Sequence, residues 1–240
     1  MSFHKFPRTR HLLNLGAATR DDLVLSEKDA AQFLDTEDQT NLKIVVEEKV
    51  DGANIGISVD SITLEMRVQN RGHYVNASTH KQFSQLDKWL AQHHSALWQL
   101  LGETGYVLYG EWLYAKHSIH YTALPDIFLA FDLYDPEKKQ FFSRRRLVSA
   151  LKGTGLQIVR EICLPHVKLC TKTLRDLAST SQSAYYDGPV EGIYVRKEDP
   201  DWLHERAKIV RAEFTNSIGD HWTRADIVRN QISPRNDPTP

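Results

Sequence analysis

One lysine lies between an apolar run and a glycine turn, with carboxylates on both sides. Residues 44–57 read Ile-Val-Val-Glu-Glu-Lys-Val-Asp-Gly-Ala-Asn-Ile-Gly-Ile, and the lysine is Lys49. A lysine at the end of a strand stands on a rigid scaffold and can be aimed at a ligand. Its amine becomes a nucleophile when nearby cations lower its pKa from the usual ~10.4. We therefore expect Lys49 to be a nucleophile, flanked by Glu48 and Asp51.

Four further charged residues and one aromatic residue follow in short motifs, each in or beside a predicted strand. In chain order they are Arg71 in Gln-Asn-Arg-Gly, Glu111 in Leu-Tyr-Gly-Glu-Trp, Phe131 in Phe-Leu-Ala-Phe-Asp-Leu-Tyr, Glu191 in Val-Glu-Gly-Ile-Tyr-Val-Arg and Lys208 in Arg-Ala-Lys-Ile-Val-Arg. A second lysine near the first would lower its pKa and would neutralise charge that builds on a phosphate in a transition state.

In sequence order, this set resembles the motifs of the covalent nucleotidyltransferases, over roughly residues 47–214. These are the polynucleotide ligases and messenger-RNA capping enzymes, which carry a nucleoside monophosphate on the lysine of a Lys-x-Asp-Gly motif. The resemblance implies an α+β class and a nucleotidyltransferase fold, the ATP-grasp-like fold of ligase adenylation domains. In this fold, antiparallel sheets are flanked by helices.

Asn54 favours one branch of that superfamily. The RNA ligase group similar to phage T4 RNA ligase 2 carries Asn at this position, whereas DNA ligases and capping enzymes usually carry Arg or another residue. Asp51 is closer to the DNA-ligase form, because the RNA ligase group typically has His there. The last motif of the group is often Lys-x-Lys, but Val210 stands at the second lysine position and Arg211 follows it. Adjacent strand residues point to opposite faces, so Arg211 need not replace the missing charge.

The resemblance also implies a role for each motif residue. Lys49 and Lys208 are the expected catalytic residues, and Lys49 would attack ATP. Mg²⁺ (or Mn²⁺) would be held by Asp51 and Glu191 together with phosphate oxygens and water. Glu111 would bind the ribose, Phe131 would stack on the base and Arg71 would contact phosphate or sugar. The full set expected at the nucleotide is Glu48, Val50, Asn54, Arg71, Glu111, Phe131, Glu191 and Lys208.

The function implied is that of an ATP-dependent RNA ligase acting in RNA repair. Lysyl-AMP would form, AMP would pass to a 5'-phosphate, and a 3'-hydroxyl would seal the break. The expected partner is RNA, as a nicked duplex or an RNA–DNA hybrid, and a protein partner that supplies nucleic-acid binding is a second expectation. Two alternatives stay open, namely a DNA ligase or repair adenylyltransferase and a non-catalytic nucleotide- or RNA-binding module.

Composition sets the remaining expectations. The 240 residues carry a net charge of -1, so no global basic field indicates nucleic-acid binding. We expect one adenylation domain over 1–240, with an N-terminal extension (1–40) packed on it, a short helix and loose tail (215–240), and no appended oligonucleotide-binding domain. No apolar run suits a signal peptide or a membrane span, which predicts a cytoplasmic protein. The two cysteines, Cys163 and Cys170, lack the partners of a zinc site and are expected to be reduced and partly buried.

Periodicity predicts the elements that position the site. Strands are expected at 43–48, 54–59, 62–69, 106–114, 127–134, 192–196 and 207–214. Helices are expected at 26–34, 83–101, 143–152 and 173–179, and residues 219–224 are expected to belong to a terminal helix.

Overall fold

The computed structural model describes residues 3–20, 22–36, 41–162, 169–215 and 227–233. Its strands are β1 (Arg10–His11), β2 (Lys43–Lys49), β3 (Ala53–Val59), β4 (Met66–Gln69), β5 (Tyr74–Val75), β6 (Val107–Trp112), β7 (Phe128–Asp135), β8 (Gln140–Phe142), β9 (Gln157–Ile158), β10 (Gly192–Glu198) and β11 (Trp202–Val210). Its helices are α1 (Glu27–Leu34), η1 (Lys81–Phe83), α2 (Leu86–Gln92), α3 (His94–Leu101), α4 (Arg144–Leu151), α5 (Thr171–Thr180) and α6 (Ala212–Thr215).

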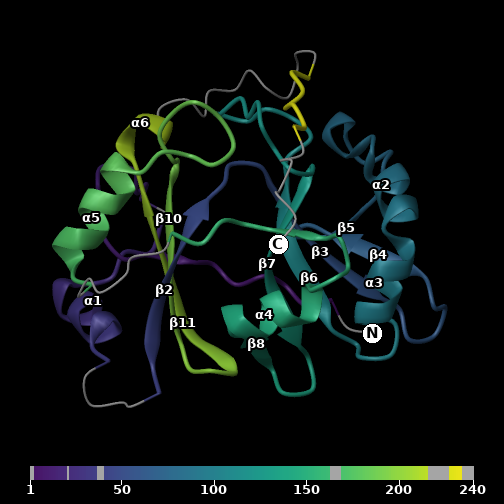
Figure 1. The fold of residues 1–240 in the computed structure, drawn as a ribbon, viewed down its shortest axis with the longest axis horizontal. Helices are drawn as coiled ribbons and strands as arrows, with labels where there is room; N and C mark the ends of the chain where they lie inside the picture. The colour runs from purple at the N-terminus through teal and green to yellow at the C-terminus, as the bar shows by residue number, and fades with distance from the viewer. Residues whose placement is uncertain (1–2, 21, 37–40, 163–168, 216–226, 234–240) are drawn as a thin grey trace.

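These strands form an 11-stranded sheet in the order β2-β10-β11-β8-β7-β6-β3-β4-β5, with β1 paired to β11 and β9 paired to β7. All pairs along the main path are antiparallel, and the two side pairs are parallel. Figure 1 shows α1 and α5 beside the β2-β10-β11 end and α2 and α3 beside the β3-β4 end. The expected α+β class, with antiparallel pairing and flanking helices, is confirmed.

Three apolar clusters divide the interior. One packs α1 and α5 on the outer face of β2, β10 and β11, with Phe33 and Ile193 among its members. A second packs α2, α3 and α4 against the outer face of β3, β6 and β7, around Trp89 and Leu108. The third lies between the two ends of the sheet and includes Tyr109. Because strand residues alternate between faces, the polar residues of β2, β6 and β11 that do not join the outer clusters point inward.

Three expected elements differ from the structure. The expected helix 83–101 is two helices, because the chain turns at His93 (φ -102°, ψ 10°), whose ring nitrogen lies 2.9 Å from the Trp89 carbonyl. The expected strand 62–69 begins only at Met66, after a turn in which the Asp60 carboxylate accepts two backbone N–H groups. The last strand begins at Trp202 and ends at Val210, so residues 212–214 belong to a helix and not to the strand.

The chain before α1 belongs to the body of the fold. The carbonyl of His4 accepts hydrogen bonds from Gln69 of β4 and Tyr109 of β6, and the Phe6 ring packs on Phe131 of β7. β1 then pairs in parallel with β11. This segment therefore crosses the inner faces of both ends of the sheet.

Residues 227–233, just before most of the expected loose tail, are anchored, since the buried Asn230 side chain bonds the carbonyls of Leu113 and Ala115. The expected terminal helix at 219–224 lies outside the described residues, as does Cys163. Cys170 is exposed, and not partly buried as expected.

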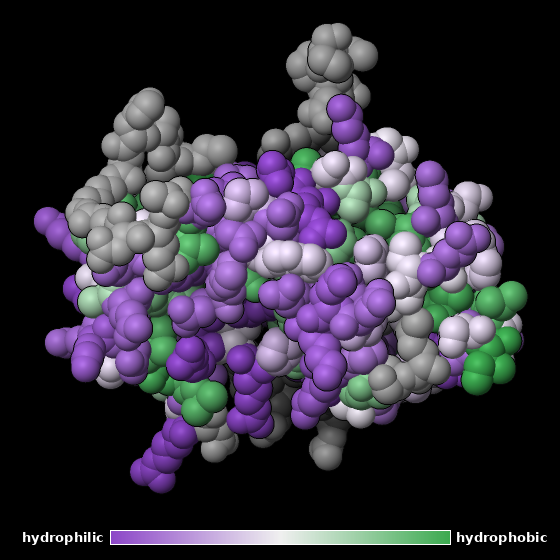
Figure 2. All heavy atoms as spheres, turned by 90° about the horizontal axis from the view of Figure 1, so that it is seen from below, coloured by the Kyte–Doolittle hydropathy of each residue, from purple (hydrophilic) through white to green (hydrophobic). Residues whose placement is uncertain are grey.

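No helix among the described residues is both long enough and apolar enough to cross a bilayer. Figure 2 shows one face of the molecule, on which hydrophilic side chains cover most of the described surface.

Candidate functional site

Lys49 is the last residue of β2, and a tight turn follows it. β2 and β10 pair so that Lys49 lies opposite Gly192. Gly52 in the turn comes so close to β6 that an added Cβ would meet the Trp112 carbonyl oxygen at 2.6 Å. Its N–H donates to Glu111 Oε1 at 3.1 Å. The Asp-Gly pair thus makes the turn and also brings the end of β2 against the end of β6.

The amine of Lys49 is paired with a carboxylate. Its Nζ lies 2.5 and 2.6 Å from the two carboxylate oxygens of Glu191, and both side chains are largely buried. Burial alone would lower the pKa of Lys49, but attraction to Glu191 and to the nearby acids outweighs it and raises the pKa overall. The sequence-based expectation that neighbouring cations lower this pKa is therefore wrong for this arrangement, which holds Lys49 as an ammonium.

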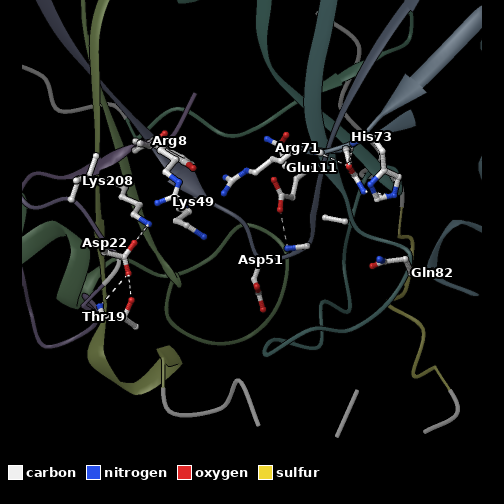
Figure 3. A pocket seen from close by; sticks show the side chains of 18 of the residues that line it. Arg8, Thr19, Asp22, Lys49, Asp51, Arg71, His73, Gln82, Glu111 and Lys208 are labelled. Atoms are coloured by element: carbon white, nitrogen blue, oxygen red, sulfur yellow. Dashed lines mark hydrogen bonds and ion pairs between the residues drawn. The ribbon is translucent and has the colours of Figure 1, made fainter. Parts of the chain in front are cut away.

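A cavity of about 740 Å³ opens beside Lys49. Six residues expected at the site line it, and these are Lys49, Asp51, Asn54, Arg71, Glu111 and Lys208. Figure 3 shows Lys208, Asp22, Thr19 and Arg8 on one side of Lys49, and Arg71, Glu111, Asp51, His73 and Gln82 on the other. Glu191 joins the set through its ion pair with Lys49. The roles given to these residues stay predictions.

Lys208 stands in β11 with its ammonium held by an acid from the N-terminal segment. Its Nζ lies 3.3 Å from Asp22 Oδ1, and the buried His11 ring lies 3.5 Å from the same oxygen. Burial lowers the pKa of Lys208, and Lys49 lowers it further, while Asp22 opposes both. Burial would raise the pKa of Asp22, but hydrogen bonds from Thr19 and Lys208 bring it down to about 2. Asp22 therefore stays ionised at neutral pH.

Glu111 faces the cavity from β6 and resists ionisation. Burial raises its pKa to about 8, although Lys49 and Arg71 favour the carboxylate, because Glu191 and Asp51 add like charge. At neutral pH a large fraction of Glu111 is therefore protonated and can both donate and accept hydrogen bonds. A sugar hydroxyl is a ligand of matching chemistry.

Asp51 is engaged with the backbone. Its Oδ2 accepts the N–H groups of Ser118 and Ile119 at 2.6 and 3.2 Å. Its own backbone N–H donates to the Tyr121 hydroxyl at 2.8 Å. Among the described residues, no group of three or more His, Cys, Asp or Glu side chains is arranged to hold a metal ion. The metal role expected of Asp51 and Glu191 stays a prediction.

Besides Glu191, three expected nucleotide contacts do not line this cavity. Glu48 points away from Lys49 because it is the next residue in the strand, and its carboxylate accepts from the Ser183 hydroxyl and the Ala184 N–H. Val50 belongs to the central apolar cluster. Phe131 also lies in that cluster and borders a separate, narrow cavity, which shares Tyr194 with the larger one. Their contacts with a nucleotide stay predictions.

The cavity also contains residues that the sequence did not indicate. Tyr194 could have been found from strand periodicity, since it lies two residues beyond Gly192 and therefore on the same face. Arg8 and Asp22 carry no such signal, because they come from a polar segment without a motif. Arg211 does not replace the missing lysine in this cavity, since its guanidinium pairs with Glu213 at 2.8 Å.

Comparisons with known proteins identify the family of this chain. The profile of the RNA ligase family matches residues 42–210, most of the chain. The chain belongs to the RNA ligase family. Among curated protein sequences, none matches it.

Solved structures of similar fold include RNA ligase from Naegleria gruberi. A mutant of that ligase with ATP and Mn superposes with a TM-score of 0.58 at 15% identity, covering 89% of this RNA ligase family member and 57% of the other chain. The same ligase with PPi gives a TM-score of 0.61 at 17% identity, covering 91% and 59%. This chain thus spans less than two thirds of the length of those ligases, and the likeness shows the shared fold.

Proposed function

We propose that this chain is an ATP-dependent RNA ligase in which Lys49 carries AMP. The observation that carries the proposal is the position of Lys49, at the end of a rigid strand and on the wall of a cavity that also contains Lys208 and Arg71. Membership of the RNA ligase family supports it, as do the ATP and Mn named for the Naegleria ligase.

In the proposed first step, the Lys49 nitrogen forms a bond to the α-phosphorus of ATP, and the bond from that phosphorus to the bridging oxygen breaks. Pyrophosphate leaves with the electron pair, and the ammonium gives up two protons over the step. Because Glu191 holds Lys49 as an ammonium, this ion pair must open before the attack. Lys208 is suited to neutralise charge on the α-phosphate.

In the later steps, AMP passes to the 5'-phosphate of a nucleic-acid strand, and a 3'-hydroxyl then attacks that phosphate and releases AMP. Glu111 is assigned to the ribose and Arg71 to phosphate or sugar, since both line the cavity. The assignment of Phe131 to the base rests on the motif alone, because its ring packs against Phe6.

The acidic side chains near Lys49 would supply part of the ligand set of a divalent cation. Asp51, Glu111 and Glu191 all act on Lys49 electrostatically, but they form no complete cage. Mg²⁺ and Mn²⁺ accept such a site, because Mg²⁺ usually keeps several waters and binds through one or two carboxylates plus phosphate oxygens. Asp51 and Glu191 would supply the carboxylates, and the cation would neutralise phosphate charge.

The test is covalent labelling with α-labelled ATP and Mg²⁺. The wild type should acquire label and an intact-mass increase of ~329 Da, as expected for a covalent AMP intermediate. Lys49→Ala should acquire neither. The matched control is Lys43→Ala, which removes an exposed lysine from the same strand. Equal labelling of Lys49→Ala, or no labelling of the wild type, would overturn the proposal.

A binding module without turnover is the second candidate, and Val210 is the observation that favours it. The position of the family's second lysine is apolar, and Arg211 is paired elsewhere. Such a module would bind ATP without any mass increase. A DNA ligase, the remaining alternative, would differ from an RNA ligase in sealing nicks that have DNA on the 3'-hydroxyl side.

A further inference from the structure

Two guanidinium groups at the cavity have no carboxylate in contact with them among the residues that the structure describes. Arg8 and Arg71 both line the cavity and are exposed. Within the described part of the chain, neither makes a hydrogen bond or an ion pair, whereas Lys49 and Lys208 each face a carboxylate. Figure 3 shows the two arginines on opposite sides of Lys49. Unpaired guanidinium groups facing one cavity suit an anionic ligand.

The two sides differ in charge. Beside Arg71 lie Glu111 and Asp51, two acidic side chains that offer a polyphosphate no counter-charge. Lys208 and Thr19 lie on the same side of Lys49 as Arg8. Among the described residues that line the cavity, the acid on this side is Asp22, which already accepts hydrogen bonds from Thr19 and Lys208. A chain of phosphates would therefore find cations and hydroxyl groups on the Arg8 side and acidic side chains on the other.

We propose that Arg8 binds the β- and γ-phosphates of the nucleotide, and so holds the pyrophosphate leaving group. This inference rests on the proposed function for its assignment to a nucleoside triphosphate. The α-phosphate must lie at Lys49 for the attack, and the ribose is assigned to Glu111 on the opposite side. The remaining two phosphates then lie toward Arg8, whose guanidinium can bind phosphate oxygens through two parallel hydrogen bonds.

The fold fixes Arg8 at this place. The carbonyl of His4 is held by Gln69 and Tyr109, and β1 pairs with β11 from Arg10 onward. Arg8 is therefore held between two anchored points, next to the strand that carries Lys208. The sequence gives no hint of this, because about forty residues separate Arg8 from Lys49.

The experiment measures binding of two probes by isothermal titration. Inorganic tripolyphosphate reports on the polyphosphate site, and AMP reports on the remainder of the nucleotide pocket. We expect Arg8→Ala to bind tripolyphosphate on the order of 10- to 100-fold more weakly, the usual effect of losing a charged hydrogen bond, with AMP affinity unchanged. The tripolyphosphate affinity of Arg8→Lys should lie between those of the wild type and Arg8→Ala, because lysine keeps the charge without the planar guanidinium group.

The matched control is Arg10→Ala, which removes a neighbouring arginine paired with Glu205 outside the cavity and should bind both probes like the wild type. Three results would overturn the inference. They are a wild type that does not bind tripolyphosphate, unchanged tripolyphosphate affinity in Arg8→Ala, and an equal loss of AMP and tripolyphosphate affinity in that variant. A selective loss of tripolyphosphate affinity in a protein that takes up no label from ATP would support the Arg8 site while refuting the proposed ligase.

Discussion

Replacing Arg196 by methionine is expected to destabilise the fold by about 3–5 kcal/mol, the usual result of removing one partner from a buried ion pair. The Arg196 guanidinium is buried and bonds Asp132 at 2.8 Å, Glu198 at 3.1 Å and the carbonyls of Phe131 and Phe142 at 3.1 and 2.9 Å. These contacts tie β10 to β7 and β8. They therefore connect the end of the sheet that holds Lys49 with the end that holds Glu111.

The magnitude follows from the charges left behind. Three carboxylates, Glu47, Asp132 and Glu198, are almost fully buried here. Arg196 contacts all three, while Arg144 and Arg206 contact fewer of them. Methionine fills much of the space but leaves these acids short of one positive charge. With a urea m-value of roughly 2–3 kcal/mol/M, the unfolding midpoint should fall by about 1–2.5 M.

Urea unfolding, monitored by tryptophan fluorescence, measures the loss of stability in Arg196→Met, with Arg145→Ala as the matched control. Arg145 is exposed and pairs with Asp201 at 3.2 Å, so its loss should cost below about 1 kcal/mol. Burial already raises the pKa of Glu47, against the pull of Arg196 and Arg144. Without Arg196, Glu47 should take up a proton on folding, so the loss of stability in Arg196→Met should become smaller as the pH falls from 7 toward 5. A midpoint shift no larger than that of Arg145→Ala would refute this account of the network.

Two further predictions concern the cavity. Glu191→Gln should lower the pKa of Lys49, because the carboxylate that raises this pKa is gone. Trinitrobenzenesulfonate should therefore modify Lys49 faster at pH 8 in the variant than in the wild type, as measured by peptide mass mapping. An unchanged rate would contradict the pairing of Lys49 with Glu191. Burial raises the pKa of Glu111 to about 8 from its usual value near 4.5, so folding binds a proton between these pH values and stability falls as the pH rises through them. Thermal unfolding from pH 5 to 8 should therefore show that the stability of Glu111→Gln rises relative to that of the wild type as the pH rises, by at most about 1.4 kcal/mol per pH unit. The same pH dependence of stability in both proteins would refute the raised pKa of Glu111.

The local part of the site could be predicted from the sequence. The apolar run before Lys49 and the Asp-Gly pair after it specify a strand and a turn through neighbouring residues alone. Strand alternation also predicts which residues share a face, yet the motif resemblance placed both Glu48 and Lys49 at the nucleotide. The structure separates their side chains because they are adjacent in β2.

The remainder depends on contacts between distant segments. In β11 three polar residues, His204, Glu205 and Arg206, interrupt the apolar pattern, and Arg206 is accommodated because Asp132 of β7 lies against it. Arg8 reaches the cavity through the pairing of β1 with β11, which short-range periodicity cannot indicate.

The inner surface of the sheet thus combines two charge arrangements. Beneath Phe131, guanidinium groups and carboxylates are matched in direct contact, so the surface closes and the two ends of the sheet are held together. Around Lys49 the surface opens into the cavity, and Arg8 and Arg71 have no carboxylate in contact among the described residues. Burying a charge without a partner is costly, so unmatched cations persist only where water or a ligand reaches them. The matched region makes the fold rigid, and the unmatched region leaves positive charge available to a phosphate chain. Both are needed if Lys49 is to meet a triphosphate in a fixed geometry.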